Sequence, residues 1–420
     1  MPRAVVLSFL LGLAFFWQVT SLFAQDAPPA LSLDDAIAQA HVVSPQRRAA
    51  QARIQAAEGA KHQASRLPNP SLDLHQENLE LGGNSRQAID RTTDLFAVFS
   101  QPIELGGKRT ARTAVAASSV AEAHALLSQS EHELTLEVLR HYLAAYHAYA
   151  LMEVVRQHRD ELRPLVAALQ RRAEEGHTAE ADVMKLQIEP TRLETQLTHA
   201  TLRFTEAATT LAILLDAPQP IAGTRLAMPA PLAPPSGDPA NLARQALDRQ
   251  PAILAARARR EQARSALELE QARRLPDPTL IAGYKRSGGH DTLVTGIEIP
   301  LPLFDQNQGN IERAAAEERM AALEFDTVYK RQLAATTALI HAAQTLTTNA
   351  QQLQQRMLHM AEIVRTAARA SFREGVTDIF RFAEEERNYA ETRREALALE
   401  IEAYEKTFAA RLLLQEGTQP

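Results

Sequence analysis

Four short segments of the chain alternate apolar and polar residues with a period of two, the pattern of a β-strand whose two faces meet different surroundings. In the fourth segment Leu293 and Ile297 share one face, and Val294 lies on the other. Strands of about 9 to 11 residues can cross a lipid bilayer when they tilt. A sheet of four strands would have two open edges, so we favour several copies that close one barrel over a small soluble sheet. The predicted strands lie at about residues 70–79, 92–103, 278–286 and 291–300.

The remaining sequence has helical composition, and two of its stretches are very long. At ~1.5 Å per residue, each of these two would extend roughly 100 Å. The shorter helices of each half, stacked end to end, would match the length of one long helix. Pro164 and Pro190 are expected to kink their helices in the first half, whereas no such interruption follows Pro302 in the second. The predicted helices lie at about residues 33–66, 108–175, 179–215, 308–374 and 378–414.

The sequence contains two internal repeats of one structural unit. The segment from Arg66 to Pro70 (RLPNP) recurs as Arg274 to Pro278 (RLPDP), and other matches have the same spacing of about 200 residues. A proline-rich stretch that cannot be helix interior separates the two halves. We therefore expect a signal peptide at 1–24, a first repeat at 25–216, a linker at 217–239, a second repeat at 240–415 and a C-terminal tail at 416–420.

Charge and composition restrict the possible locations and partners. The first 24 residues carry one charge, Arg3, before the apolar run from Val5 to Phe16, and they end in a small residue, Ala24. This is the layout of a cleaved secretory signal peptide. The chain has no cysteine, so it has neither disulfides nor a thiolate metal site, and its formal charge of −6 argues against a nucleic-acid partner. No later window is apolar enough for a spanning helix, so any membrane crossing must use strands.

Two segments that follow predicted strands carry a family resemblance. Gln101 to Arg109 (QPIELGGKR) and Ile299 to Asn310 (IPLPLFDQNQGN) resemble the TolC family of outer-membrane efflux proteins, and more narrowly the CzcC-type subunits of heavy-metal cation efflux systems. Proline and glycine in these segments would turn a membrane strand into a periplasmic helix. The residues expected at this strand-to-helix transition are Pro102, Gly106, Gly107, Pro300, Pro302 and Gly309.

The resemblance implies a mainly α fold with a small contribution to a membrane β-barrel. It implies a homotrimeric 12-stranded outer-membrane β-barrel, continuous with a 12-helix periplasmic α-barrel, four strands coming from each chain. The partners that it implies are a periplasmic adaptor (membrane fusion) protein, an inner-membrane RND transporter and outer-membrane lipid. The implied role is a passive exit duct for substrates, heavy-metal cations in the narrower resemblance.

The resemblance also points to the turns between the long helices and the returning helices as the adaptor contact and gate. Acidic residues at these turns would form carboxylate rings around the axis of a trimer, and such rings attract cations. The alternative is that they are solvated charges near helix ends. Glycine at each turn would supply the left-handed conformation with which a helix stops. The candidate residues are Glu174, Glu175, Gly176, Asp182, Glu374, Gly375 and Asp378.

No catalytic or cofactor motif survives inspection. The segment Gly106 to Thr110 lacks the earlier glycine and the Ser or Thr after lysine that a phosphate loop needs. No two histidines have the i, i+4 spacing that places two imidazoles on one helical face. We therefore expect neither an enzyme nor a resident metal or cofactor. Drug efflux or type I secretion remains an alternative within the same fold, and a soluble periplasmic coiled-coil scaffold is an alternative outside it.

Overall fold

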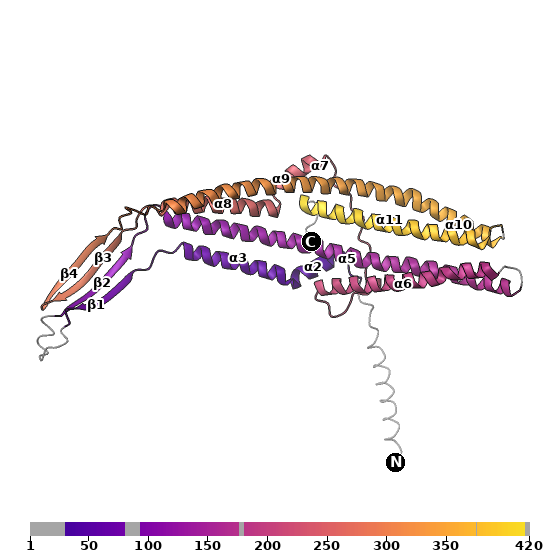
Figure 1. The fold of residues 1–420 in the computed structure, drawn as a ribbon, viewed down its shortest axis with the longest axis horizontal. Coiled ribbons are helices and arrows are strands. Elements are labelled where there is room, and N and C mark those ends of the chain that lie inside the picture. The colour runs from indigo at the N-terminus through magenta and orange to yellow at the C-terminus, as the bar shows by residue number, and fades with distance from the viewer. Residues whose placement is uncertain (1–29, 80–92, 176–179, 375, 416–420) are drawn as a thin grey trace, which may run out of the picture. The chain divides into compact units, whose positions relative to one another are not determined.

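The computed structural model describes residues 30–79, 93–175, 180–374 and 376–415. Within these ranges the chain is mostly helical and has one small sheet, as the sequence predicts (Figure 1). Up to residue 216 the elements are α2 (Leu33–Val43), α3 (Pro45–Ala64), β1 (Ser71–Glu77), β2 (Asp94–Pro102), α5 (Lys108–Glu174) and α6 (Glu180–Leu214). They are followed by η1 (Gly223–Arg225), α7 (Pro239–Leu247), α8 (Pro251–Ala272), β3 (Thr279–Ser287), β4 (His290–Glu298), α9 (Gln308–Gln352), η2 (Leu353–Leu358), α10 (His359–Arg373) and α11 (Ile379–Leu414).

The four strands form one antiparallel sheet in the order β1-β2-β3-β4. Its central pairing joins the two halves of the sequence, with Pro102 opposite Thr279. Large apolar side chains on both outer strands are exposed, including Leu74 on β1 and Leu293 on β4. The sheet therefore has no hydrophobic core over either outer strand within the part of the chain that is described, and its apolar residues require another apolar environment.

The predicted helix at 33–66 is two helices in the structure. The first, α2, begins where the hydroxyl of Ser32 accepts a hydrogen bond from the amide of Asp35 at 3.1 Å. It ends at Ser44, whose ψ of 119° leaves the helical region. Pro45 favours this break, because the proline ring disfavours the helical conformation at the residue before it. Gln250 before Pro251 repeats the same break between α7 and α8.

The other helices also differ in whether and where they are interrupted. Both α5 and α6 continue as single helices through Pro164 and Pro190. The second half has no proline between Pro302 and the C-terminal tail, but a π-helical segment, Leu353–Leu358, lies between α9 and α10 within the helix predicted at 308–374. No proline lies in that segment, so a wider hydrogen-bonded turn makes the interruption. By hydropathy, none of the helices in the described ranges could cross a bilayer.

The chain divides into two compact units, and each contains parts of both sequence halves. The first combines residues up to Ser44 with Leu134–Ser236 and the chain from Leu339 onward, and the second combines Pro45–Glu133 with Gly237–Ala338. Tyr142 lies in the main hydrophobic core of the first unit, where its hydroxyl is 2.8 Å from the carbonyl oxygen of Leu31. The second unit contains the sheet.

Candidate functional site

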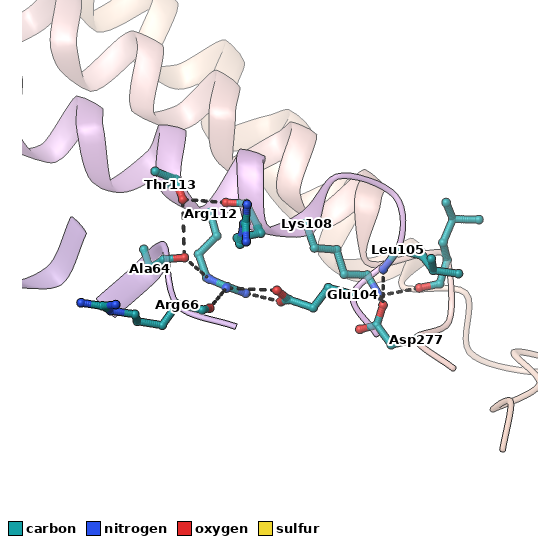
Figure 2. Close-up of polar contacts among 10 residues, drawn as sticks. Ala64, Arg66, Glu104, Leu105, Lys108, Arg112, Thr113 and Asp277 are labelled. Carbon is teal, nitrogen blue, oxygen red and sulfur yellow. Dashed lines mark hydrogen bonds and ion pairs between the residues drawn. The ribbon is translucent and has the colours of Figure 1, made fainter. Parts of the chain in front are cut away.

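The start of α5 forms a polar junction that joins the end of β2 to the segments before β1 and β3 (Figure 2). The amide of Ile103 extends the β2–β3 pairing by donating to the carbonyl oxygen of Pro278 at 2.8 Å. Gly106 and Gly107 then have φ values of 70° and 74° and turn the chain into α5. These two glycines and Pro102 lie where the sequence analysis expects the strand-to-helix transition.

Two separate reasons favour glycine at position 106. Its positive φ lies in the left-handed region, which disfavours a residue with a Cβ atom. A Cβ atom added there would also lie 2.8 Å from Leu275 Cδ1 and 3.2 Å from the carbonyl oxygen of Ala272. Gly107 has the same backbone conformation, but a Cβ atom there would meet nothing within 4 Å. Alanine substitutions at these two positions therefore separate the effect of backbone strain from that of steric contact.

We expect Gly106→Ala to lower the free energy of unfolding more than Gly107→Ala does. The left-handed conformation costs each alanine about 1–2 kcal/mol. Only the alanine at 106 would also displace Leu275. Urea denaturation in detergent, followed by circular dichroism, measures both variants against the unchanged chain. Equal losses at the two positions would contradict the importance of the Leu275 contact.

Arg112 holds the end of α3 against the junction. Its Nε donates to the carbonyl oxygen of Ala64 at 2.8 Å, and its Nη2 donates to that of Arg66 at 3.0 Å. Both Nη atoms also contact the carboxylate of Glu104, which forms a bidentate ion pair (Figure 2). One planar guanidinium thus satisfies two carbonyl groups at a helix end, where no intrahelical donor remains for them.

Lys108, the first residue of α5, makes the matching connection to the second half of the sequence. Its Nζ lies 2.7 Å from Asp277 Oδ1 and 2.6 Å from the carbonyl oxygen of Leu275. The amide of Leu105 also donates to Asp277 Oδ1, at 2.9 Å (Figure 2). The Lys108 side chain is only 10% exposed. A largely buried ion pair therefore fixes the start of α5 beside the start of β3.

The junction after β4 is built differently. Pro300 and Pro302 are exposed, and Gly309 lies in the first turn of α9 without a positive φ. The residue with the left-handed conformation is Asn307, at φ 63°. Its side-chain nitrogen donates to the main-chain oxygen and to the carboxylate of Glu270, both at 2.8 Å. The asparagine therefore makes the turn here and attaches the loop to α8.

The candidate residues at the helix turns are separated by the structure into different environments. Glu174 ends α5, and Glu175 follows it; both side chains are exposed. Glu374 is the exposed C-cap residue of α10. Gly176 and Gly375 lie outside the described residues, and Asp182 is described only as a backbone position in α6.

Asp378 has a local role that the sequence analysis did not assign to it. It is the N-cap residue of α11, and its Oδ1 accepts a hydrogen bond from the amide of Arg381 at 2.8 Å. An aspartate at this position satisfies a free amide and interacts favourably with the helix dipole. The carboxylate is still exposed, so the cap leaves it accessible to solvent and ions.

A partly buried charge cluster connects α5, α10 and α11. Arg369 Nη2 lies 2.7 Å from Glu161 Oε2 and 3.0 Å from Glu386 Oε1. Arg365 lies 3.6 and 3.7 Å from the same two carboxylates, and its guanidinium carbon is 4.1 Å from the ring centre of Tyr389. The Glu386 side chain is 2% exposed. Two arginines on successive turns of α10 thus connect a carboxylate of α5 with one of α11.

The two carboxyl groups of this cluster have different pKa values. The pKa of Glu386 is raised to about 7, chiefly by burial and then by its hydrogen bond with Glu161 and the Glu161 charge, while Arg365 and Arg369 act to lower it. Burial also acts to raise the pKa of Glu161, but hydrogen bonds with Glu386 and Arg369 outweigh it and lower that pKa. Near neutral pH the cluster therefore holds one carboxylate and one partly protonated carboxyl group.

The residues that form the junction at the start of α5 and the charge cluster of α5, α10 and α11 were not singled out from the sequence. Lys108 and Asp277 belong to quoted motifs, but nothing in their spacing indicates that they pair with each other. Arg365 and Arg369 have the i, i+4 spacing of one helical face, which was an available signal. Glu386 is one of many acidic residues in α11, and only packing distinguishes it.

The described residues contain no group of three or more His, Asp or Glu side chains placed to hold a metal ion. Like that of His147, the Nε2 of His158 is buried without a hydrogen-bond partner. Burial and the charge of Arg394 lower its pKa, which favours the neutral imidazole. The arrangement at both sites is suited to fixing helices rather than to bond-making chemistry.

Long helices that continue directly from an exposed four-stranded sheet are the architecture of TolC-like outer-membrane proteins. The model of the outer membrane efflux protein family matches residues 36–216 and 242–409. The chain therefore belongs to this family, and it is an outer-membrane protein.

Curated relatives and solved structures agree with this family. The chain is 28% identical over 84% of its length to the cobalt-zinc-cadmium resistance protein CzcC of Cupriavidus metallidurans, 82% of which is covered. It is 27% identical over 72% of its length to the nickel and cobalt resistance protein CnrC of the same organism, 69% of which is covered. The outer membrane protein VceC of Vibrio cholerae has the same fold, with a TM-score of 0.73 at 22% identity over 92% of this chain and 97% of that one. CusC, described as a transmembrane channel, also gives 0.73, at 16% identity over 94% and 95% of the two chains.

Proposed function

We propose that the chain is the outer-membrane channel subunit of a tripartite efflux system and acts as a passive exit duct for heavy-metal cations. The observation that carries this proposal is the exposed antiparallel sheet, joined by fixed junctions to long helices in a member of the efflux family. The cation class comes from the curated relatives, whose names include cobalt, zinc, cadmium and nickel resistance.

We propose a homotrimer in which the strands of three chains close one 12-stranded barrel and the helices form a 12-helix periplasmic tunnel. Two findings support it. The outer strands β1 and β4 have no partner on one side among the described residues, and closure with neighbouring chains would pair both edges. Their exposed apolar residues would then face lipid.

The working partners in this proposal are a periplasmic adaptor protein and an inner-membrane RND transporter. The turns near Glu174 and Glu374 would contact the adaptor and gate the tunnel, because these exposed acidic side chains lie at the ends of the long helices. The proposal also includes export by a cleaved signal peptide at 1–24, and repeats at 25–216 and 240–415 that flank the linker at 217–239.

Single-channel conductance in planar bilayers tests the duct. We expect the purified chain to give stepwise currents that prefer cations. Neutralising Glu374→Gln together with Asp378→Asn should move the cation-to-anion permeability ratio toward one, because three copies of each carboxylate would surround the pore axis. Asn caps a helix as well as Asp does, so Asp378→Asn removes the charge without removing the cap, whereas Asp378→Ala also costs about 1 kcal/mol of stability.

Asp326→Asn is the matched control, because Asp326 is an exposed acidic residue within α9 rather than at a turn. It should leave selectivity unchanged. The absence of conductance from folded, membrane-inserted protein would refute the channel. Unchanged selectivity in the double variant would refute the acidic constriction alone.

A further inference from the structure

A groove of about 310 Å³ lies beside the segment that connects β4 to α9, in the unit that contains the sheet. Its charged lining residues are Arg273, Arg274 and Asp305. The remaining lining residues are Pro276, Pro300, Leu301, Pro302, Gln306 and Asn307. Three prolines have no amide donor and restrict the backbone, so the groove is bounded by stiff segments. The junction contacts described above involve none of these three charged side chains.

The groove is held in shape by polar contacts. Glu270 accepts from Arg273 Nη1 at 2.6 Å and from the side-chain nitrogen of Asn307 at 2.8 Å, so it fixes the end of α8 against the loop. Asp305 Oδ1 accepts a hydrogen bond from the amide of Asn307 at 2.8 Å. Arg274 is exposed, and no ion pair of its side chain occurs among the described residues. Its guanidinium is available for a ligand.

The rim of the groove continues into strongly apolar surface. Leu301, Leu303 and Phe304 are 73%, 72% and 92% exposed, and they follow Ile299, which is also exposed. A phenylalanine with almost its entire side chain in solvent is unfavourable in water, because each exposed apolar Å² costs about 25 cal/mol relative to burial. Apolar residues beside basic residues are typical of segments that lie in the interface of a membrane.

We propose that this groove binds the phosphoethanolamine headgroup of a phospholipid, with its acyl chains lying along Leu301, Leu303 and Phe304. The two guanidinium groups suit the phosphate, since arginine binds phosphate through paired charge-assisted hydrogen bonds. The carboxylate of Asp305 suits the ammonium group. An anionic ligand alone would leave Asp305 repelling it, which is why the charges favour a zwitterionic headgroup.

This inference rests on the proposed function, because only a sheet that lies in the bilayer brings the groove to the headgroup layer. Groove residues start two positions after the end of β4 at Glu298, so a spanning strand would place them at the membrane boundary. Basic pockets at that level recognise lipid headgroups in other membrane proteins.

Native mass spectrometry of the full purified chain, delipidated in detergent and supplied with one defined lipid at a time, tests the site. We expect phosphatidylethanolamine to be retained in preference to phosphatidylcholine, whose ammonium group has no N–H donor. Arg274→Gln should weaken retention about tenfold, the effect of losing one charge-assisted hydrogen bond. Asp305→Asn, which keeps the acceptor for Asn307, should abolish the preference for phosphatidylethanolamine over phosphatidylglycerol.

Arg264→Gln is the control, because Arg264 is an exposed arginine of α8, the helix that precedes Arg274, and does not line the groove. If Arg274→Gln does not fold, Arg274→Lys keeps the charge without the paired geometry and should give intermediate retention. Equal retention of phosphatidylcholine, preferred retention of phosphatidylglycerol by the unchanged chain, or no effect at Arg274 would each overturn the site.

Conductance of the same preparations separates this inference from the proposed function. Conducting protein without selective lipid retention would overturn the headgroup site alone. Selective retention by protein that does not conduct would overturn the duct and leave the headgroup site supported.

Discussion

Replacing Asp277 with alanine is expected to lower the free energy of unfolding by about 2–3 kcal/mol, below the usual range for a fully buried ion pair because Asp277 is partly exposed. The change leaves the Lys108 ammonium group, whose side chain is 10% exposed, with only the carbonyl oxygen of Leu275 as a partner. It also removes the acceptor for the amide of Leu105. Urea-induced unfolding in detergent at a fixed chain concentration measures the loss.

A second change at the same pair separates the charge from the geometry. Lys108→Met combined with Asp277→Ala should be less destabilising than Asp277→Ala alone, because no buried charge is then left unpaired. Asp248→Ala is the matched control, since Asp248 forms an ion pair of 2.6 Å with Arg257 in the same unit but is 69% exposed. It should change stability by no more than about 1 kcal/mol. A loss at Asp248 as large as that at Asp277 would show that burial does not determine the effect.

Glu386→Gln is expected to remove a pH dependence of stability. The folded-state pKa of Glu386 is about 7, above the ordinary value of 4.5. Between these two values the folded chain holds a proton that the unfolded chain has released, so the stability that this proton supplies is lost as pH rises from about 4.5 to 7. The lowered pKa of Glu161 acts in the opposite sense, and its contribution is lost as pH falls through that lowered value.

The glutamine cannot ionise, so the variant should lack the loss between pH 4.5 and 7. At pH 8 it should exceed the unchanged chain in stability by an amount on the order of 2 kcal/mol. Chemical denaturation at several pH values, followed by circular dichroism, measures both chains. Glu384→Gln is the control, because Glu384 is exposed on the same helix. A parallel decline in the Glu386→Gln variant would assign the pH dependence to other groups.

Several features of the fold could be predicted because they depend on local chemistry. Alternation over four short segments identified the strands, and helical composition over long stretches identified α5 and the helices after β4. The prolines were less predictable. Pro45 follows Ser44, whose backbone leaves the helical region, whereas Pro164 lies inside a helix that continues. The sequence contains no proline or glycine that would indicate the π-helical segment at Leu353–Leu358.

The residues of the candidate sites also differ in whether the sequence could predict them. Gly106 and Gly107 were identifiable, because glycine is the residue that accepts a left-handed turn without strain. Asn307 was not singled out as the turning residue of the second junction, although asparagine also tolerates that conformation. The exposed acidic residues at the helix turns were named from the sequence, but the capping role of Asp378 depends on where α11 begins.

Most helical and strand segments, the first strand-to-helix junction and the family of the chain could be predicted from the sequence, since they depend on residues near one another. The pairing of Lys108 with Asp277 and the burial of Glu386 beside two arginines of α10 are known only from the folded chain. These contacts join residues far apart in the chain. Their energies depend on burial and on the low local dielectric, which arise when separate helices pack and which no local pattern records.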